Sequence, residues 1–104
     1  MEKASKVVLD FAKERDWEQF HTPENLAKSI SIEAGELLEC FQWDSNYDED
    51  EVRKELADVV IYCIHLANRL GVRLEDIVLD KMKEVAKKYP VGKSKGNSKK
   101  YTEF

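Results

Sequence analysis

The chain has 104 residues, of which 37% are charged, and its formal net charge at pH 7 is -4. This length favours a single domain, the acidic balance argues against nucleic acid as a partner, and the absence of an apolar run of roughly 20 residues argues against a membrane span. Because the N-terminus MEKASKVV also lacks the apolar core of a signal peptide, we expect a cytoplasmic protein whose two cysteines, Cys40 and Cys63, are reduced thiols.

The first half of the chain predicts two helices separated by a short connection. Apolar residues recur at helical spacing over residues 2–15, and we expect the segment WEQFH that follows to be a loop. Thr22 is typical of a helix N-cap and Pro23 of the first helical position, where the missing N–H is not needed. The second helix is therefore predicted to begin there and to run to about Gln42.

The second half predicts two more helices and a polar tail. The connection DSNYDED ends in acidic residues that suit a helix N-terminus, so a third helix is expected over residues 49–70, ended by Gly71. A fourth helix is predicted over residues 74–89, before a proline. We expect residues 1–92 to form one helical domain, and residues 93–104 to form a basic tail without a helix pattern.

The second predicted helix carries a carboxylate inside its apolar face. At about 100° per residue this face is formed by Leu26, Ile30, Leu37 and Phe41. Glu33 falls among these residues, and Glu36 falls at their border. The third helix repeats the arrangement, because Asp58 lies within the apolar stretch LADVVIYCIHLA and Glu55 precedes it by one helical turn. A helix that is apolar nearly all round predicts burial on both sides, by its own bundle and by a second subunit.

These two E-x-x-[ED] pairs predict a metal site. A buried carboxylate is costly unless it is paired or bound to a metal, and few cationic residues are nearby in the sequence. Four converging carboxylates would raise one another's pKa, whereas a divalent cation removes the repulsion. Oxygen ligands without histidine or cysteine at the same spacing favour Mg²⁺, with Mn²⁺ as a substitute.

Two other interpretations of the carboxylates remain open. One is a set of solvated salt bridges at an oligomer interface. The other is a ferritin-like di-iron site, which requires Glu-x-x-His, whereas Tyr62 stands three residues before His65.

Several stretches occur in an order that is typical of one family: ERDWEQFH, EAGELLECFQW, ELADVVIYCIHLA, KM, YP and KKYTE. With them the chain resembles the MazG-like all-α nucleoside triphosphate pyrophosphohydrolases, in particular the dCTP pyrophosphatase type. The resemblance implies a four-helix MazG-like bundle that assembles as a homodimer or as a homotetramer, a dimer of dimers. It implies Mg²⁺ bound by Glu33, Glu36, Glu55 and Asp58. It also implies hydrolysis of a (deoxy)nucleoside triphosphate, with dCTP or a related dNTP first, to the monophosphate and pyrophosphate.

The resemblance further implies which residues contact the substrate. WEQFH and the tryptophan of FQW line the base and sugar pocket in the family, and here they are Trp17, Glu18, Gln19, Phe20, His21 and Trp43. Tyr62 matches a family tyrosine that contacts substrate and shares a helix face with Glu55 and Asp58. Lys81, together with Lys99, Lys100 and Tyr101 of the tail, could hold phosphates as the tail closes over the substrate. Core packing of the aromatic residues and a solvated tail are the alternatives.

The chain departs from the family pattern at three positions. Ile32 stands where many relatives carry a second glutamate that is proposed as the water-activating base, so Glu33 and Glu36 are the candidate catalytic residues and the base stays open. Val8 stands where the dCTP type carries a histidine near the base, and Val85 stands where many relatives carry an asparagine. A non-catalytic helical interaction module that kept the fold is the alternative function.

Overall fold

A computed structural model describes residues 1–43 and 46–103 of the chain. Part of the predicted polar connection and the last residue of the tail therefore lie outside the described residues. Every regular element in the described part is helical, which confirms the all-α class. The chain divides into two compact units, Met1–Leu74 and the residues from Glu75 onward, and each unit is described by itself.

The long helices agree with the predicted ones to within a few residues. The segment WEQFH, which we predicted to be a loop, contains a 3-10 helix, and the tail contains two short helical turns that its composition did not predict. The second helix also ends earlier than Gln42. In chain order the elements are α1 (Glu2–Glu14), η1 (Glu18–Phe20), α2 (Pro23–Glu39), α3 (Glu49–Arg69), α4 (Leu74–Lys88), α5 (Val91–Ser94) and η2 (Tyr101–Glu103).

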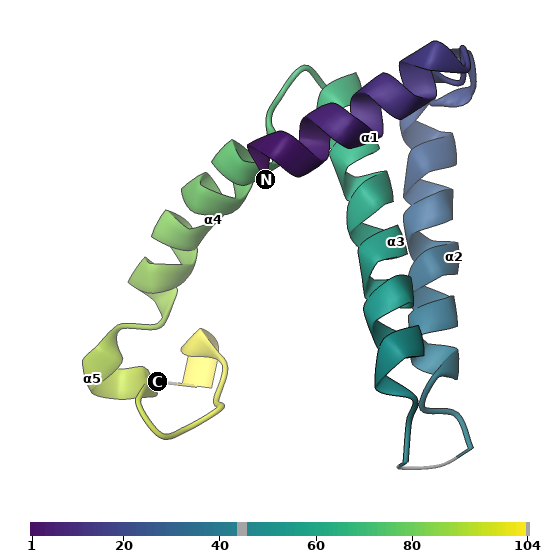
Figure 1. The fold of residues 1–104 in the computed structure, drawn as a ribbon. Helices are drawn as coiled ribbons and strands as arrows, with labels where there is room; N and C mark the ends of the chain where they lie inside the picture. Colours follow the sequence, from purple (N-terminus) through teal and green to yellow (C-terminus); the bar gives the residue numbers. More distant parts are fainter. Residues whose placement is uncertain (44–45, 104) are drawn as a thin grey trace. The chain divides into compact units, whose positions relative to one another are not determined.

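In the first unit, α2 and α3 form an antiparallel pair and α1 lies across α3 (Figure 1). The buried apolar side chains come from all three helices: Ala12, Leu26, Ile64 and Ala67. Leu26, which we predicted to face inward from α2, is only 1% exposed. Leu26 lies near the start of α2, and Ile64 and Ala67 lie near the end of the antiparallel α3, so the apolar core lies near the end of the pair that α1 covers.

The end of α1 is fixed by a Schellman motif. Asp16 has a φ of 55°, a left-handed conformation that aspartate tolerates better than most residues. The backbone N–H of Trp17 donates to the carbonyl of Ala12 at 3.0 Å, and the N–H of Asp16 donates to that of Lys13 at 3.1 Å. The hydrophobic contact that accompanies this motif is made by the rings of Trp17 and Phe11, whose centroids are 5.6 Å apart. The reversal of the chain therefore places Trp17 against α1.

The predicted start of α2 is confirmed. The hydroxyl oxygen of Thr22 accepts a hydrogen bond from the backbone N–H of Asn25 at 3.2 Å, and Pro23 takes the first helical position. The side-chain amide of Asn25 in turn donates to the carbonyl of Phe20 at 3.2 Å. These bonds join η1 to α2 and so fix the segment between Trp17 and Thr22.

Both ends of α3 are also fixed by local capping interactions. A carboxylate oxygen of Asp48 accepts a hydrogen bond from the backbone N–H of Asp50 at 3.0 Å and caps the N-terminus. Gly71 has a φ of 75°, and the N–H of Val72 donates to the carbonyl of Ala67 at 3.0 Å. The prediction that Gly71 ends the helix is therefore confirmed.

The second unit consists mainly of α4 and the turns that follow it. The Tyr101 ring lies against the end of α4, with its centroid 6.0 Å from that of Tyr89 and 4.8 Å from the ammonium nitrogen of Lys88. The tail from α5 to η2 is therefore folded back within its own unit.

Apolar side chains of the first unit remain exposed along both α2 and α3. Ile32, Leu38 and Leu56 are each more than half exposed in the single chain. The expected covering of this surface by a second subunit stays a prediction. No helix in the described part of the chain is both long and apolar enough to cross a membrane.

Candidate active site

Three carboxylates from two helices converge in the first unit. Glu33 of α2 and Glu55 and Asp58 of α3 each offer an oxygen atom, and these atoms lie within 4.8 Å of one another. The antiparallel packing of α2 on α3 brings Glu33 of the first predicted pair to both members of the second pair. Glu36, the fourth predicted ligand, is more exposed. It lines an acidic groove together with Glu55 and lies beside the cluster.

The carboxylates of this cluster raise one another's pKa. The pKa of Glu33 is raised first by its hydrogen-bonding contact with Glu36, then by burial and by the negative charges of Glu36, Asp58 and Glu55. The pKa of Glu55 is raised first by burial and then by its contact with Glu36. A shared proton or a cation would relieve this repulsion.

Two oxygen atoms of the cluster are buried without a hydrogen-bond partner. They are the Oε2 atoms of Glu33 and Glu55. Buried carboxylate oxygens are normally hydrogen-bonded or bound to a metal, so these two atoms are suited to a hard cation. Because the cluster contains no histidine among the described residues, its donor set differs from that of a ferritin-like di-iron site. The acidic cluster can therefore hold a metal ion.

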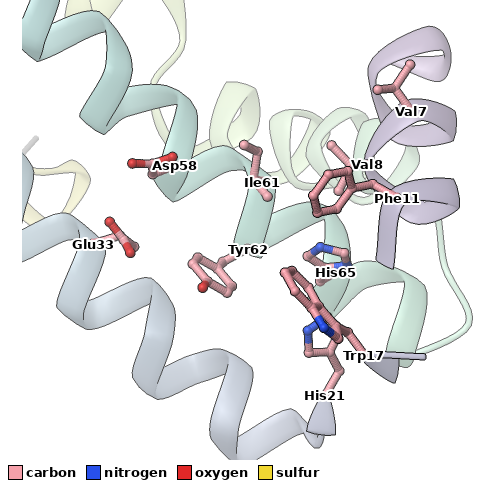
Figure 2. A pocket seen from close by; sticks show the side chains of 10 residues that line it. All are labelled: Val7, Val8, Phe11, Trp17, His21, Glu33, Asp58, Ile61, Tyr62 and His65. Atoms are coloured by element: carbon pink, nitrogen blue, oxygen red, sulfur yellow. The ribbon is translucent and has the colours of Figure 1, made fainter. Parts of the chain in front are cut away.

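A cavity of about 400 Å³ opens beside the carboxylates (Figure 2). Glu33 and Asp58 lie at one end, Ile61 and Tyr62 lie in the middle, and aromatic and imidazole rings gather at the other end. Its full lining is Val7, Val8, Phe11, Trp17, His21, Glu33, Asp58, Ile61, Tyr62 and His65. This volume and the mainly apolar wall are typical of sites for small organic molecules.

Three of the residues predicted to contact substrate line this cavity. They are Trp17, His21 and Tyr62. Glu18 does not line it and instead borders a second, small cavity of about 90 Å³ behind the histidines. Gln19 turns back to Asp16, donating from its side-chain amide to the backbone carbonyl at 2.9 Å.

Two further aromatic residues lie apart from this cavity. Phe20 is largely exposed, and Trp43, just after the end of α2, is 88% exposed. Neither belongs to the cavity lining in the single chain. Their roles at the base stay predictions.

The remaining predicted residues belong to the second unit. Lys81 on α4 donates to a carboxylate oxygen of Glu84 at 2.9 Å. Lys100 is exposed, and Tyr101 packs against the end of α4. Their predicted contact with phosphates stays a prediction.

The sequence did not predict that His65 lies in the wall of the cavity. Its side chain is buried, and its ring centroid is 4.5 Å from that of His21. The signal was its spacing, because His65 follows Asp58 by seven residues and Tyr62 by three and so shares their helix face. The apolar wall from α1 includes Val7 and also Val8, which stands where the dCTP type carries a histidine near the base.

The chain is similar to known enzymes over its whole length. A profile of the MazG-like family matches residues 28–104. The chain is 40% identical to dCTP pyrophosphatase 1 of Mus musculus and 39% identical to that of Homo sapiens, covering all of this chain and 67% of each relative. The crystal structure of a pyrophosphatase from Archaeoglobus fulgidus matches with a TM-score of 0.75 at 40% identity, over 86% of this chain and 92% of that one.

The helical fold, the carboxylate cluster and these relatives define the class of the protein as a nucleoside triphosphate pyrophosphohydrolase. Within this class, the chain belongs to the MazG-like family, as its motifs predicted. The alternative of a non-catalytic interaction module is not supported, because the relatives are enzymes and the carboxylates that the motifs share converge in space.

Proposed function

We propose that the chain hydrolyses a deoxynucleoside triphosphate, dCTP or a related dNTP first, to the monophosphate and pyrophosphate with the help of Mg²⁺. The observation that carries the proposal is the position of the carboxylate cluster, with its two unpartnered buried oxygens, at one end of a cavity large enough for a nucleoside. The names of the mammalian relatives support dCTP as the first substrate to test.

The metal would be held by Glu33, Glu36, Glu55 and Asp58, with Mn²⁺ as a substitute. The three converging carboxylates supply hard oxygen ligands from two helices that pack on each other. Glu36 contacts both Glu33 and Glu55, which supports it as the fourth ligand. A bound divalent ion neutralises charge on the triphosphate and lowers the pKa of an attacking water.

The chain's own residues would orient the substrate along the cavity. The triphosphate would lie at the carboxylate end, and the base would extend toward the aromatic end of the lining. The Trp17 ring, held against Phe11 by the end of α1, offers a flat face on which a base can stack. Tyr62 lies between the two ends and would contact the sugar.

Glu33 and Glu36 are the proposed catalytic residues. They lie in contact with each other beside the cavity, so a carboxylate of this pair could accept a proton from the attacking water. Ile32, which stands where relatives carry a further glutamate, is exposed on α2 and cannot take this role.

The assembly and the biological setting are part of the proposal. The exposed apolar residues of α2 and α3 support a homodimer or homotetramer. Hydrolysis of surplus or non-canonical dNTPs in the cytoplasm is the expected role, and the tail from Lys93 onward is expected to close over bound substrate.

The test is a product analysis. The purified chain is incubated with Mg²⁺ and each common NTP or dNTP in turn, beside Glu36→Gln. A control, Glu24→Gln, removes an exposed carboxylate from the first turn of α2. We expect monophosphate and pyrophosphate from the wild type and the control, and a large loss in Glu36→Gln. Diphosphate plus phosphate as products would mean that a different phosphate bond is cleaved from the one proposed. No turnover with Mg²⁺ or Mn²⁺ would refute the proposal.

A further inference from the structure

His65 is a buried imidazole between two cavities. Its side chain is 8% exposed, and it is the one buried residue with a polar side chain among residues 1–43 and 46–103. With His21 it lines both the cavity of about 400 Å³ and the small cavity of about 90 Å³ behind it. The two rings therefore form a wall that separates the larger cavity from the polar residues Glu18, Asn68 and Arg69.

The ring of His65 is available to a ligand. Its contacts are the rings of His21, with centroids 4.5 Å apart, and of Tyr62, with centroids 6.4 Å apart. No side-chain hydrogen bond joins His65 to another residue in the described part of the chain. Because the ring lines the cavity, its nitrogen atoms can form hydrogen bonds with a molecule bound there.

The charge state of His65 suits a neutral ligand. Its pKa is lowered, first by burial and then by the neighbouring His21, and Glu18 opposes this only in part. The ring is therefore neutral near pH 7 and presents one N–H donor and one bare nitrogen acceptor. Such a pair of groups matches the hydrogen-bonding edge of a nucleobase, whereas an imidazolium would favour a phosphate.

Helix α3 fixes the distance between His65 and the carboxylates. Asp58 lies seven residues earlier on the same face, which separates the two Cα atoms along the axis by about 10 Å at 1.5 Å per residue. This span is comparable with the length of a nucleoside. The wall from α1 consists of Val7, Val8 and Phe11, which offer no hydrogen bond. Hydrogen bonds to the polar edge of the base therefore come from the polar side chains of the lining, and among these His65 lies on the same helix as Asp58.

We propose that His65 is a specificity-determining residue, whose ring hydrogen-bonds the edge of the base while the triphosphate lies at Glu33 and Asp58. The inference rests on the proposed function and adds to it the residue that selects the base. Base preference is then set by one helix that carries both a metal ligand and the base-reading group.

The test compares substrates that differ only at this edge. dCTP and dUTP exchange an amino group for a carbonyl on the pyrimidine ring, so kcat/KM for both is measured for the wild type, His65→Leu and His65→Gln. Asn68→Leu is the control, because Asn68 lies one turn further along α3 and borders only the small cavity. We expect the wild type to discriminate between the two substrates, and His65→Leu to change the ratio by about 10- to 100-fold.

The other variants sharpen the result. His65→Gln, which keeps a donor and an acceptor, should retain part of the ratio, and Asn68→Leu should leave it unchanged. An equal fall of both kcat/KM values in His65→Leu would mean a structural role and would overturn the inference. So would a wild type that hydrolyses dCTP and dUTP equally well, although the proposed function would then stand. A wild type that hydrolyses neither nucleotide would overturn the inference, and it would overturn the proposed function as well if no other dNTP is hydrolysed.

A measurement on the wild type covers the case in which both variants fail to fold. The ring ¹⁵N resonances of His65 are followed by NMR while dCMP or deoxyribose 5-phosphate is added. We expect the His65 resonances to shift with dCMP and not with the base-free sugar phosphate. Equal responses to the two ligands would place the base elsewhere and overturn the inference.

Discussion

The two ends of the large cavity are built on opposite principles. At one end, Glu33, Glu55 and Asp58 bring like charges together, and two of their oxygens are buried without partners. At the other end, Trp17 packs on Phe11 and His21 packs on His65, so these rings are held in place by contacts with one another. The carboxylate end therefore needs a ligand to become stable, whereas the aromatic end is preformed by packing and by the Schellman motif of α1.

This difference allows the contributions of the two ends to catalysis and to substrate affinity to be measured separately. The carboxylate end should govern turnover and metal dependence, and the aromatic end should govern affinity for the base. A substitution at the carboxylate end should leave affinity for the base unchanged. A substitution at the aromatic end should leave turnover and metal dependence unchanged. The following predictions test that separation, from the largest expected effect to the smallest.

The largest effect is expected from Glu55→Gln. It removes a carboxylate oxygen from the converging set, so kcat should fall by at least about 100-fold in the presence of Mg²⁺. Steady-state kinetics with the preferred dNTP, beside Glu24→Gln, measure this. A kcat within a few-fold of the wild type would exclude Glu55 as a metal ligand.

Trp17→Ala should affect only the aromatic end of the cavity. Loss of a stacking ring should raise KM by roughly 10-fold, since stacking of a base on an aromatic side chain contributes about 1–3 kcal/mol. Trp17→Phe should restore most of the affinity, and the stabilisation by Mg²⁺ should be unchanged in both. Trp43→Ala in the same assay tests the predicted role of that exposed ring, because a matching rise in KM would show that Trp43 reaches the base in the assembled enzyme.

Thermal stability should depend on pH and Mg²⁺ together. The pKa values of Glu33 and Glu55 are raised in the folded chain, so the metal-free fold holds their protons more tightly than the unfolded chain does. Their contribution to stability is therefore present at low pH and is lost as the pH rises from the ordinary carboxyl pKa through the raised values. Above that window a metal offsets the loss.

The measurement is the melting temperature as a function of pH with and without Mg²⁺. We expect a rise of roughly 10 °C at neutral pH when the metal concentration is about 100 times its Kd, and a much smaller rise near pH 4. Glu33→Gln should melt at a higher temperature than the metal-free wild type at neutral pH and should respond less to Mg²⁺. A stabilisation by Mg²⁺ that is independent of pH would contradict this account.

The smallest effect is expected from the turn that positions Trp17. Asp16→Val puts a β-branched residue at a φ of 55° and should destabilise the fold by about 1–2 kcal/mol, or several degrees in melting temperature. Asp16→Gly, which has no steric conflict there, should melt close to the wild type. Circular dichroism during heating distinguishes them, and equal melting temperatures would mean that the turn does not hold the left-handed conformation.

Local sequence signals predicted the helices and the carboxylate pairs well. Thr22 with Pro23 and Gly71 act through bonds within a few residues of themselves, so their roles followed from sequence. Glu33 stood out because a carboxylate at that angle interrupts an apolar face, and the packing of α2 on α3 then brought it to Glu55 and Asp58.

What depended on the packing of α1 could not be predicted. The position of Trp17 follows from the left-handed Asp16, a conformation that most aspartates do not adopt. The spacing of His65 on α3 indicates that it shares a helix face with Asp58 and Tyr62, but the cavity on that face is closed by residues of α1, whose packing on α3 the spacing does not specify. The helical turns in the tail are stabilised by contacts such as that between Tyr101 and Tyr89, which a polar and basic composition does not reveal.

The unpartnered oxygens of Glu33 and Glu55 also bear on how the enzyme would respond to laboratory evolution. In a screen for heat resistance without added metal, neutral replacements at these positions should be enriched, because each relieves the repulsion in the cluster. The same replacements remove two of the groups that we propose hold the metal. A library selected for stability alone would therefore collect inactive enzymes, and only a screen run with Mg²⁺ and substrate would keep both properties.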